Sequence, residues 1–134
     1  MRPIFDAHLD LALNALILSR DIRKTLPEIN KSESGMKDYP GRQHASVCLP
    51  AMRRAGVKVA LATLLARYSE GKRPEEGFTR ANIDYPTLPE AYSAAKAQLE
   101  YYKLLEKTGE ISIIKDKKDL NTAWKGGGQI INPA

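Results

Sequence analysis

The sequence has very little cysteine and no long apolar run. Its 134 residues contain one cysteine, Cys48, so an internal disulfide and a zinc site built only from cysteines are both excluded. No stretch approaches the ~18 apolar residues that a membrane-spanning helix requires. Asp6 stands where a signal peptide would need its apolar segment. We therefore expect a soluble, cytoplasmic protein without a transmembrane segment.

Length and charge set further bounds. A length of 134 residues suits one domain, so a single domain is expected over residues 1–134. The chain is too short for a closed (β/α)₈ barrel, which needs about 250 residues. Lys and Arg outnumber Asp and Glu by 21 to 16, which gives a formal net charge of +5. The basic residues are scattered, most have an acidic neighbour, and no aromatic residues interleave with them. This pattern is typical of solvated surfaces and does not favour nucleic-acid binding.

The apolar spacing predicts an α/β fold in which strands alternate with helices. Strands are expected at 3–8, 57–65 and 111–114, and helices at 10–20, 50–55, 87–109 and 116–124. The spacing of Thr87 and Glu90 predicts a capping box at the start of the helix at 87–109. Long loops are expected at 21–43, with one helical turn at most, and at 67–86. The glycine-rich residues 126–134 are expected to be a short tail. Strands joined through helices predict a parallel sheet, whose functional residues follow the carboxyl ends of the strands.

Two predictions concern packing. Tyr92, Ala95, Leu99 and Tyr102 repeat at helical spacing, which predicts a stripe that faces the core. Cys48 precedes a helix and has no histidine near it in sequence, so we expect a small buried side chain rather than a nucleophile.

At the end of the first expected strand, Asp6, His8 and Asp10 alternate with apolar residues. Because strand side chains alternate between faces, His8 and Asp10 are expected to point the same way. An imidazole and a carboxylate together suit zinc or a similar divalent ion, and Asp6 could orient His8. The alternative is that Asp10 only caps the next helix and His8 is a hydrogen-bonded residue at a strand end. Spacing alone favours this alternative.

Two further residues are weaker candidates. His44 lies in an expected loop and could reach a site, but an exposed loop histidine is the favoured interpretation. Tyr68 follows the second expected strand and could contact a substrate on position alone. No residue is assigned a catalytic role.

Two blocks of the sequence resemble the membrane (renal) dipeptidase family, which are metallopeptidases built on the amidohydrolase-type barrel. Residues 5–10 (FDAHLD) match the family's opening strand, which ends Asp-x-His-x-Asp. Residues 49–57 (LPAMRRAGV) are similar to the family's Leu-Pro-x-x-Arg-x-Gly-Gly-Val. The family's second strand is matched by residues 57–65, although its usual Gly-x-Gln-Phe is replaced by residues 58–61 (KVAL).

The resemblance implies a partial (β/α) barrel with parallel strands, the amino-terminal part of a TIM-barrel metallohydrolase. It also implies a zinc-dependent dipeptidase that cleaves the amide bond of dipeptides with two zinc ions. His8 and Asp10 would bind one of these ions, and Asp6 would support them.

The family's other metal ligands lie further along the chain: a bridging glutamate, two histidines and an aspartate. They have no counterpart here, and no glutamate follows Glu110. The resemblance therefore implies a truncated chain that binds zinc poorly and is inactive alone. A partial barrel would expose apolar edges, so association with another copy or a partner is expected. The alternative function is a non-catalytic α/β fragment or interaction module.

Overall fold

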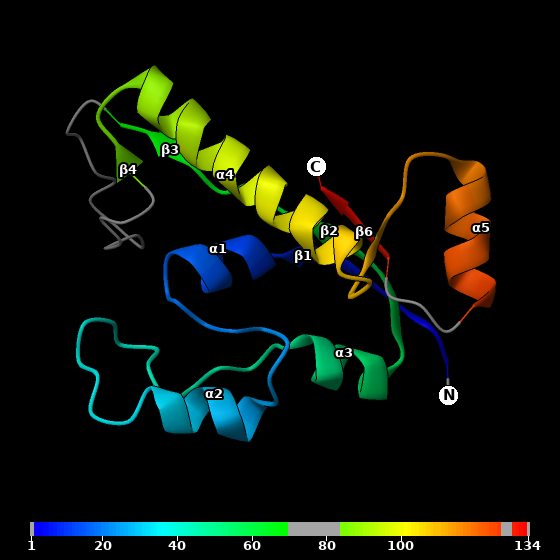
Figure 1. Ribbon diagram of the computed structural model, residues 1–134, viewed down its shortest axis with the longest axis horizontal. Helices are drawn as coiled ribbons and strands as arrows, with labels where there is room; N and C mark the ends of the chain where they lie inside the picture. Colours follow the sequence, from blue (N-terminus) through cyan, green and yellow to red (C-terminus); the bar gives the residue numbers. More distant parts are fainter. Residues whose placement is uncertain (1, 70–83, 127–129, 134) are drawn as a thin grey trace.

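The computed structural model describes residues 2–69, 84–126 and 130–133. The main sheet has four parallel strands in the order β1-β2-β6-β5. These are β1 (Ile4–Leu9), β2 (Val57–Ala62), β5 (Ser112–Ile113) and β6 (Ile130–Pro133). The helices are α1 (Leu11–Leu16), α2 (Leu26–Ser32), α3 (Leu49–Ala55), α4 (Leu88–Lys107) and α5 (Lys117–Lys125) (Figure 1). The prediction of an α/β fold with parallel strands is confirmed, whereas four strands in an open sheet do not test the barrel.

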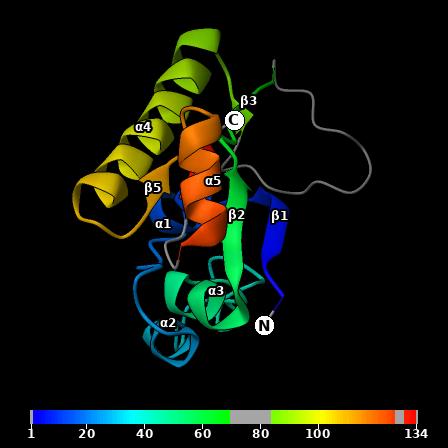
Figure 2. The ribbon, with the colours of Figure 1, turned by 90° about the vertical axis from the view of Figure 1, so that its right-hand side faces the viewer.

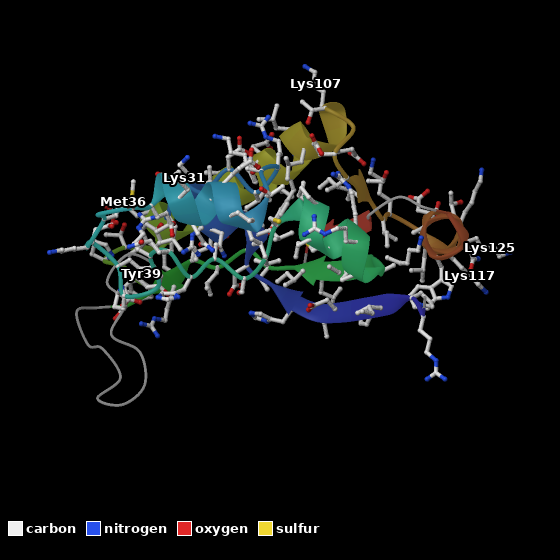
Figure 3. The ribbon with its side chains drawn as sticks, turned by 90° about the horizontal axis from the view of Figure 1, so that it is seen from below. Lys31, Met36, Tyr39, Lys107, Lys117 and Lys125 are labelled. Carbon is white, nitrogen blue, oxygen red and sulfur yellow. The ribbon has the colours of Figure 1, made fainter. Side chains whose placement is uncertain are left out.

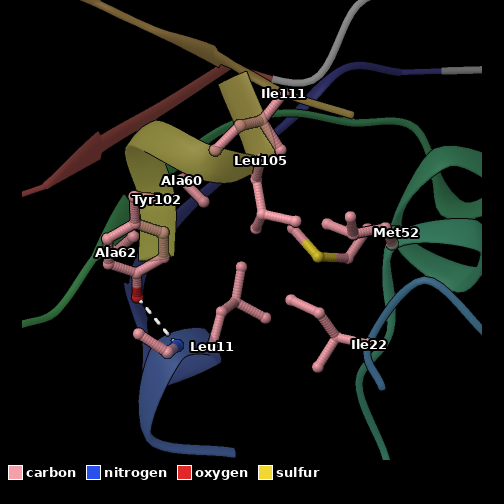
Figure 4. Close-up of a cluster of buried hydrophobic side chains, with 10 residues drawn as sticks. Leu11, Ile22, Met52, Ala60, Ala62, Tyr102, Leu105 and Ile111 are labelled. Carbon is pink, nitrogen blue, oxygen red and sulfur yellow. Dashed lines mark hydrogen bonds between the residues drawn. The ribbon is translucent and has the colours of Figure 1, made fainter. Parts of the chain in front are cut away.

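The centre of the fold is β2, which lies between β1 and β6. Ala60 and Ala62 of this strand are buried in the main core cluster, shown in Figure 4. The other buried members come from α1, α3, α4 and the segments beside them: Leu11, Ala12, Ile22, Leu49, Met52, Tyr102, Leu105 and Ile111. Val59 alternates away from these residues and packs with Ala123 of α5, which stands alongside β2 in Figure 2. Among the described residues, no helix is long and apolar enough to cross a membrane.

Side-chain caps start α3, α4 and α5, and at α5 the Asp116 carboxylate accepts from the Asp119 N–H at 2.9 Å. At α4 the Thr87 hydroxyl accepts from the Glu90 N–H at 3.4 Å and donates to the Glu90 carboxylate at 2.7 Å. This is the cap predicted from the Thr-x-x-Glu spacing. At α3 the fully buried Cys48 accepts from the Ala51 N–H through Sγ at 3.4 Å. The prediction that Cys48 is a buried side chain is confirmed.

The predictions for residues 10–43 were wrong in two places. α1 ends at Leu16 rather than near Arg20, and Ser19 has a positive φ of 54° where the chain turns. The expected loop at 21–43 contains the two-turn helix α2. Its start is stabilised by Glu28, whose carboxylate accepts from the N–H and the hydroxyl of Thr25 at 2.8 and 2.6 Å.

A buried ionic cluster connects these segments, although the basic residues were expected on solvated surfaces. Glu33 accepts from Arg20 Nε, from Arg42 Nη1 and from the Gln43 N–H, each at 2.7 Å. Arg20 also donates to Asn14 Oδ1 at 2.9 Å. The Arg20 and Arg42 guanidiniums lower the pKa of Glu33 to about 2. Paired arginines are tolerated inside a protein because each charge meets an opposite charge and hydrogen bonds.

The predicted core stripe of α4 was wrong at Tyr92, whose surface is 67% exposed. Gln98 is buried in its place and binds the Leu65 backbone, donating to its carbonyl at 2.8 Å and accepting from its N–H at 2.7 Å. A polar residue thus occupies the buried face, because its amide satisfies both backbone groups. Apolar spacing alone could not assign this face.

The predicted tail was also wrong, since residues 130–133 form β6 between β2 and β5. Four residues are too few to show a strand period, and β6 is defined by its pairing with distant segments. In the expected loop at 67–86, β3 (Arg67–Tyr68) and β4 (Asp84–Tyr85) form a small parallel sheet. Residues 70–83 of that loop lie outside the described residues.

Candidate metal site

The two expected metal ligands lie together at the carboxyl end of β1. His8 Nε2 and Asp10 Oδ1 are 3.2 Å apart. The His8 side chain is 69% exposed and the Asp10 side chain is 31% exposed. The His8 side chain is therefore open to solvent, whereas the Asp10 side chain is only partly exposed.

Asp10 occupies the N-cap position of α1, but its side chain makes no capping hydrogen bond. The Ala12 N–H in the first turn instead donates to the Tyr102 hydroxyl of α4 at 3.0 Å, the dashed line in Figure 4. Asp10 is thus the N-cap residue of α1, as the alternative expected, but its carboxylate does not make the capping bond and contacts His8 instead.

The Tyr102 hydroxyl also donates to the Thr63 carbonyl at 3.1 Å. Its side chain is fully buried, and burial raises the pKa of Tyr102 to about 12. The hydroxyl therefore keeps its proton at neutral pH and serves as both donor and acceptor. Tyr102 was predicted only as a core residue, so its hydrogen bonds are a finding of the structure.

Thr63, which follows β2, makes the closest contact to the Asp10 carboxylate. Its hydroxyl donates to Asp10 Oδ1, the oxygen that faces His8. Its backbone N–H donates to the Leu9 carbonyl at 3.0 Å, which fixes the ends of β1 and β2 beside each other. Thr63 was not predicted as a site residue. The available signal was a hydroxyl residue within an apolar strand, close to the edge where sites form.

Asp6 contacts His8 through the backbone. Its Oδ1 accepts from the His8 N–H at 2.9 Å. This bond restrains the chain at His8, whereas the sequence-based expectation placed Asp6 against the imidazole.

A cavity of about 230 Å³ adjoins the candidate site. Its lining includes Asp10, Asn14, Arg20, Tyr39, His44 and Ser46. His44 is exposed, as expected, and lies on the wall of this cavity. Tyr68 lies in the small β3–β4 sheet. A larger hollow of about 430 Å³ lies between the segment after α1 and α4, and it contains none of the candidate ligands.

The donor set fits zinc. Imidazole nitrogen and carboxylate oxygen are both common zinc ligands, with bonds of about 2.0–2.2 Å. The 3.2 Å between His8 Nε2 and Asp10 Oδ1 is the distance of a direct contact between the two side chains. Two ligands on a tetrahedral ion lie a similar distance apart, roughly 3.3 Å. Within residues 2–69, 84–126 and 130–133, no group of three or more His, Cys, Asp or Glu side chains is placed to hold a metal. Among the described residues the pair therefore offers two candidate ligand atoms, fewer than the three protein ligands of an ordinary zinc site.

Comparison with solved structures identifies a similar fold. The match is a crystal structure of a dipeptidase, described as dipeptidase AC, a metallopeptidase of family M19, with a TM-score of 0.60 and 16% sequence identity. The chain has a dipeptidase-like fold. The match covers 98% of this chain and 34% of the dipeptidase, so this chain spans about one third of its length. No family model and no curated protein sequence matches this chain.

Proposed function

We propose that this chain is part of a metal-dependent, dipeptidase-like hydrolase and that His8 and Asp10 hold one zinc ion. The observation that carries the proposal is the exposed His8–Asp10 pair at the carboxyl end of a parallel strand, where α/β enzymes place their sites. The dipeptidase-like fold supports the same interpretation. The proposed substrates are dipeptides or related small amides.

The roles of the chain's own residues follow from the geometry. His8 offers Nε2 and Asp10 offers Oδ1, while Thr63 fixes the direction of that carboxylate. Asp6 restrains the backbone that carries His8. Held by these residues, a zinc ion would supply Lewis-acid polarisation of an amide carbonyl and would lower the pKa of a water molecule. The high exposure of His8 leaves space for a peptide on the same side.

Two ligands hold a metal weakly, so we propose that hydrolysis requires further ligands from residues outside these 134. The dipeptidase of similar fold is about three times as long as this chain, which leaves room for such residues in a longer protein. We expect the isolated chain to bind zinc weakly and to leave dipeptides uncleaved. Tight stoichiometric zinc together with dipeptide turnover would contradict this expectation.

Calorimetric titration with zinc chloride tests the metal site directly. We expect weak binding by the natural chain and a loss of about tenfold or more in H8A and in D10A, since each substitution removes half of the ligand set. H44A is the matched control, because it removes the chain's other histidine and leaves the pair intact. Unchanged binding by the H8A/D10A double variant would show that the metal lies elsewhere.

The second candidate function is a non-catalytic α/β module. It is favoured by the limit of two candidate ligands among the described residues and by an exposed strand at the edge of the sheet. The same titration separates the two candidate functions. For the hydrolase we expect zinc binding that depends on His8 and Asp10, whereas for a non-catalytic module we expect no such dependence.

A further inference from the structure

The Asp10 carboxylate does not cap α1, although Asp10 stands at the N-cap position. An aspartate at the N-cap ordinarily accepts from the N–H of the second or third helical residue. In α1 the second residue is Ala12, and its N–H donates to Tyr102. We propose that Tyr102 and Thr63 are positioning residues for Asp10: Tyr102 satisfies the helix start, and Thr63 directs the released carboxylate toward His8.

Burial of the start of α1 makes it costly to leave the Ala12 N–H without a hydrogen-bond acceptor. Its first three residues, Leu11, Ala12 and Leu13, are buried, so water is poorly placed to satisfy their backbone N–H groups. A buried donor without a partner is costly, and a nearby carboxylate is a strong acceptor. Removal of the Tyr102 hydroxyl therefore favours rotation of Asp10 into the capping position, away from His8.

Thr63 contacts both Tyr102 and Asp10. Its carbonyl accepts from Tyr102, and its hydroxyl donates to Asp10 Oδ1. The hydroxyl is therefore expected to select one rotamer of Asp10. Loss of this hydroxyl leaves the Tyr102 contact in place, so the two residues can be tested separately. The effect on zinc rests on the proposed function, whereas the orientation of Asp10 does not.

The experiment measures the χ1 rotamer of Asp10 by NMR couplings in the metal-free chain and zinc affinity by calorimetry. In Y102F we expect Asp10 to change rotamer toward the Ala12 N–H, and zinc affinity to fall about tenfold, as for other groups that orient metal ligands. In T63V we expect averaged rotamers and a similar loss of affinity. T63S retains a hydroxyl and should restore both properties.

Q98L is the matched control for a merely structural effect. Gln98 is also a buried polar residue of α4 that binds the chain after β2, but it contacts Leu65 rather than Thr63. We expect Q98L to lower the melting temperature and to leave the Asp10 rotamer and zinc affinity unchanged.

The outcomes distinguish the two proposals. An Asp10 rotamer that is the same in the natural chain, Y102F and T63V overturns the positioning roles, whatever happens to zinc. A rotamer change without any zinc binding that depends on His8 and Asp10 supports the positioning roles and overturns the proposed function. If Y102F fails to fold, the comparison of T63V with T63S decides, since equal rotamers in these two variants overturn the inference.

Discussion

At the scale of single residues, Glu33 connects the α2 region to the candidate site. It binds Arg20 and Arg42, and Arg20 donates to Asn14 Oδ1. Asn14 Nδ2 in turn donates to the Asp10 carbonyl at 2.9 Å. The buried cluster therefore supports the backbone of Asp10 as well as the segment after α1.

The first residue-scale prediction concerns E33Q. Loss of the charge leaves the buried Arg20 guanidinium without a carboxylate and leaves Arg42 with Asp38 alone. Breaking a buried pair in this way costs roughly 3–5 kcal/mol in the free energy of unfolding. Urea denaturation at neutral pH measures this loss. D38N is the control, because Asp38 also binds Arg42 but is largely exposed, and we expect a loss below about 1 kcal/mol. Equal losses in the two variants would contradict the prediction.

The same variant has a defined pH dependence. The folded-state pKa of Glu33 is lowered from 4.5 to about 2, so between these values the unfolded chain binds more protons than the folded chain. The contribution of Glu33 is therefore complete above pH 4.5 and is lost as the pH falls toward 2. The difference in unfolding free energy between the natural chain and E33Q should shrink over that interval. A difference that stays constant from pH 7 to 2 would exclude this linkage.

At the scale of elements, local signals predicted some helices and missed another with the same signal. Thr87 and Glu90 identified the start of α4, while the equivalent Thr25 and Glu28 were overlooked. The region around α2 has few apolar residues, so no hydrophobic period predicted a helix after this cap. The stabilisation of α2 comes from its cap, the buried Ile29 and the cluster at Glu33.

In the candidate site, contacts between residues close in sequence were predicted, whereas contacts between residues far apart in sequence were not. His8 and Asp10 are two residues apart, so strand alternation was enough to place them together. Thr63 and Asp10 are 53 residues apart, and Ala12 and Tyr102 are 90 apart. Their contacts depend on the packing of β2 and α4 around α1, which no local pattern encodes. The position of β6 at the centre of the sheet is non-local in the same way.

The prediction at this scale tests the cap of α2. In T25A the hydroxyl that donates to Glu28 is lost, and we expect the free energy of unfolding to fall by about 1 kcal/mol. K31A is the matched control, since Lys31 is an exposed residue of the same helix. Thermal denaturation followed by circular dichroism measures both variants. A T25A chain as stable as K31A would show that the cap contributes nothing measurable.

At the scale of the whole molecule, the sheet ends in an exposed strand. β1 pairs with β2 on one side, and no strand among the described residues pairs with its other side (Figure 3). Ile4 and Phe5 on this edge are 42% and 52% exposed. In the isolated chain, unpaired backbone groups beside apolar side chains favour association.

We therefore expect the purified chain to associate with a second copy through β1, with a population that rises with protein concentration. F5K places a charge on the exposed edge, which opposes strand pairing between copies and should return the chain to a monomer. Y92K is the matched control, because Tyr92 is a comparably exposed aromatic residue on α4, away from the sheet edge. Sedimentation velocity over a concentration series measures all three proteins. Association that persists in F5K and disappears in Y92K would place the contact on α4, and a natural chain that stays monomeric throughout would contradict association at β1.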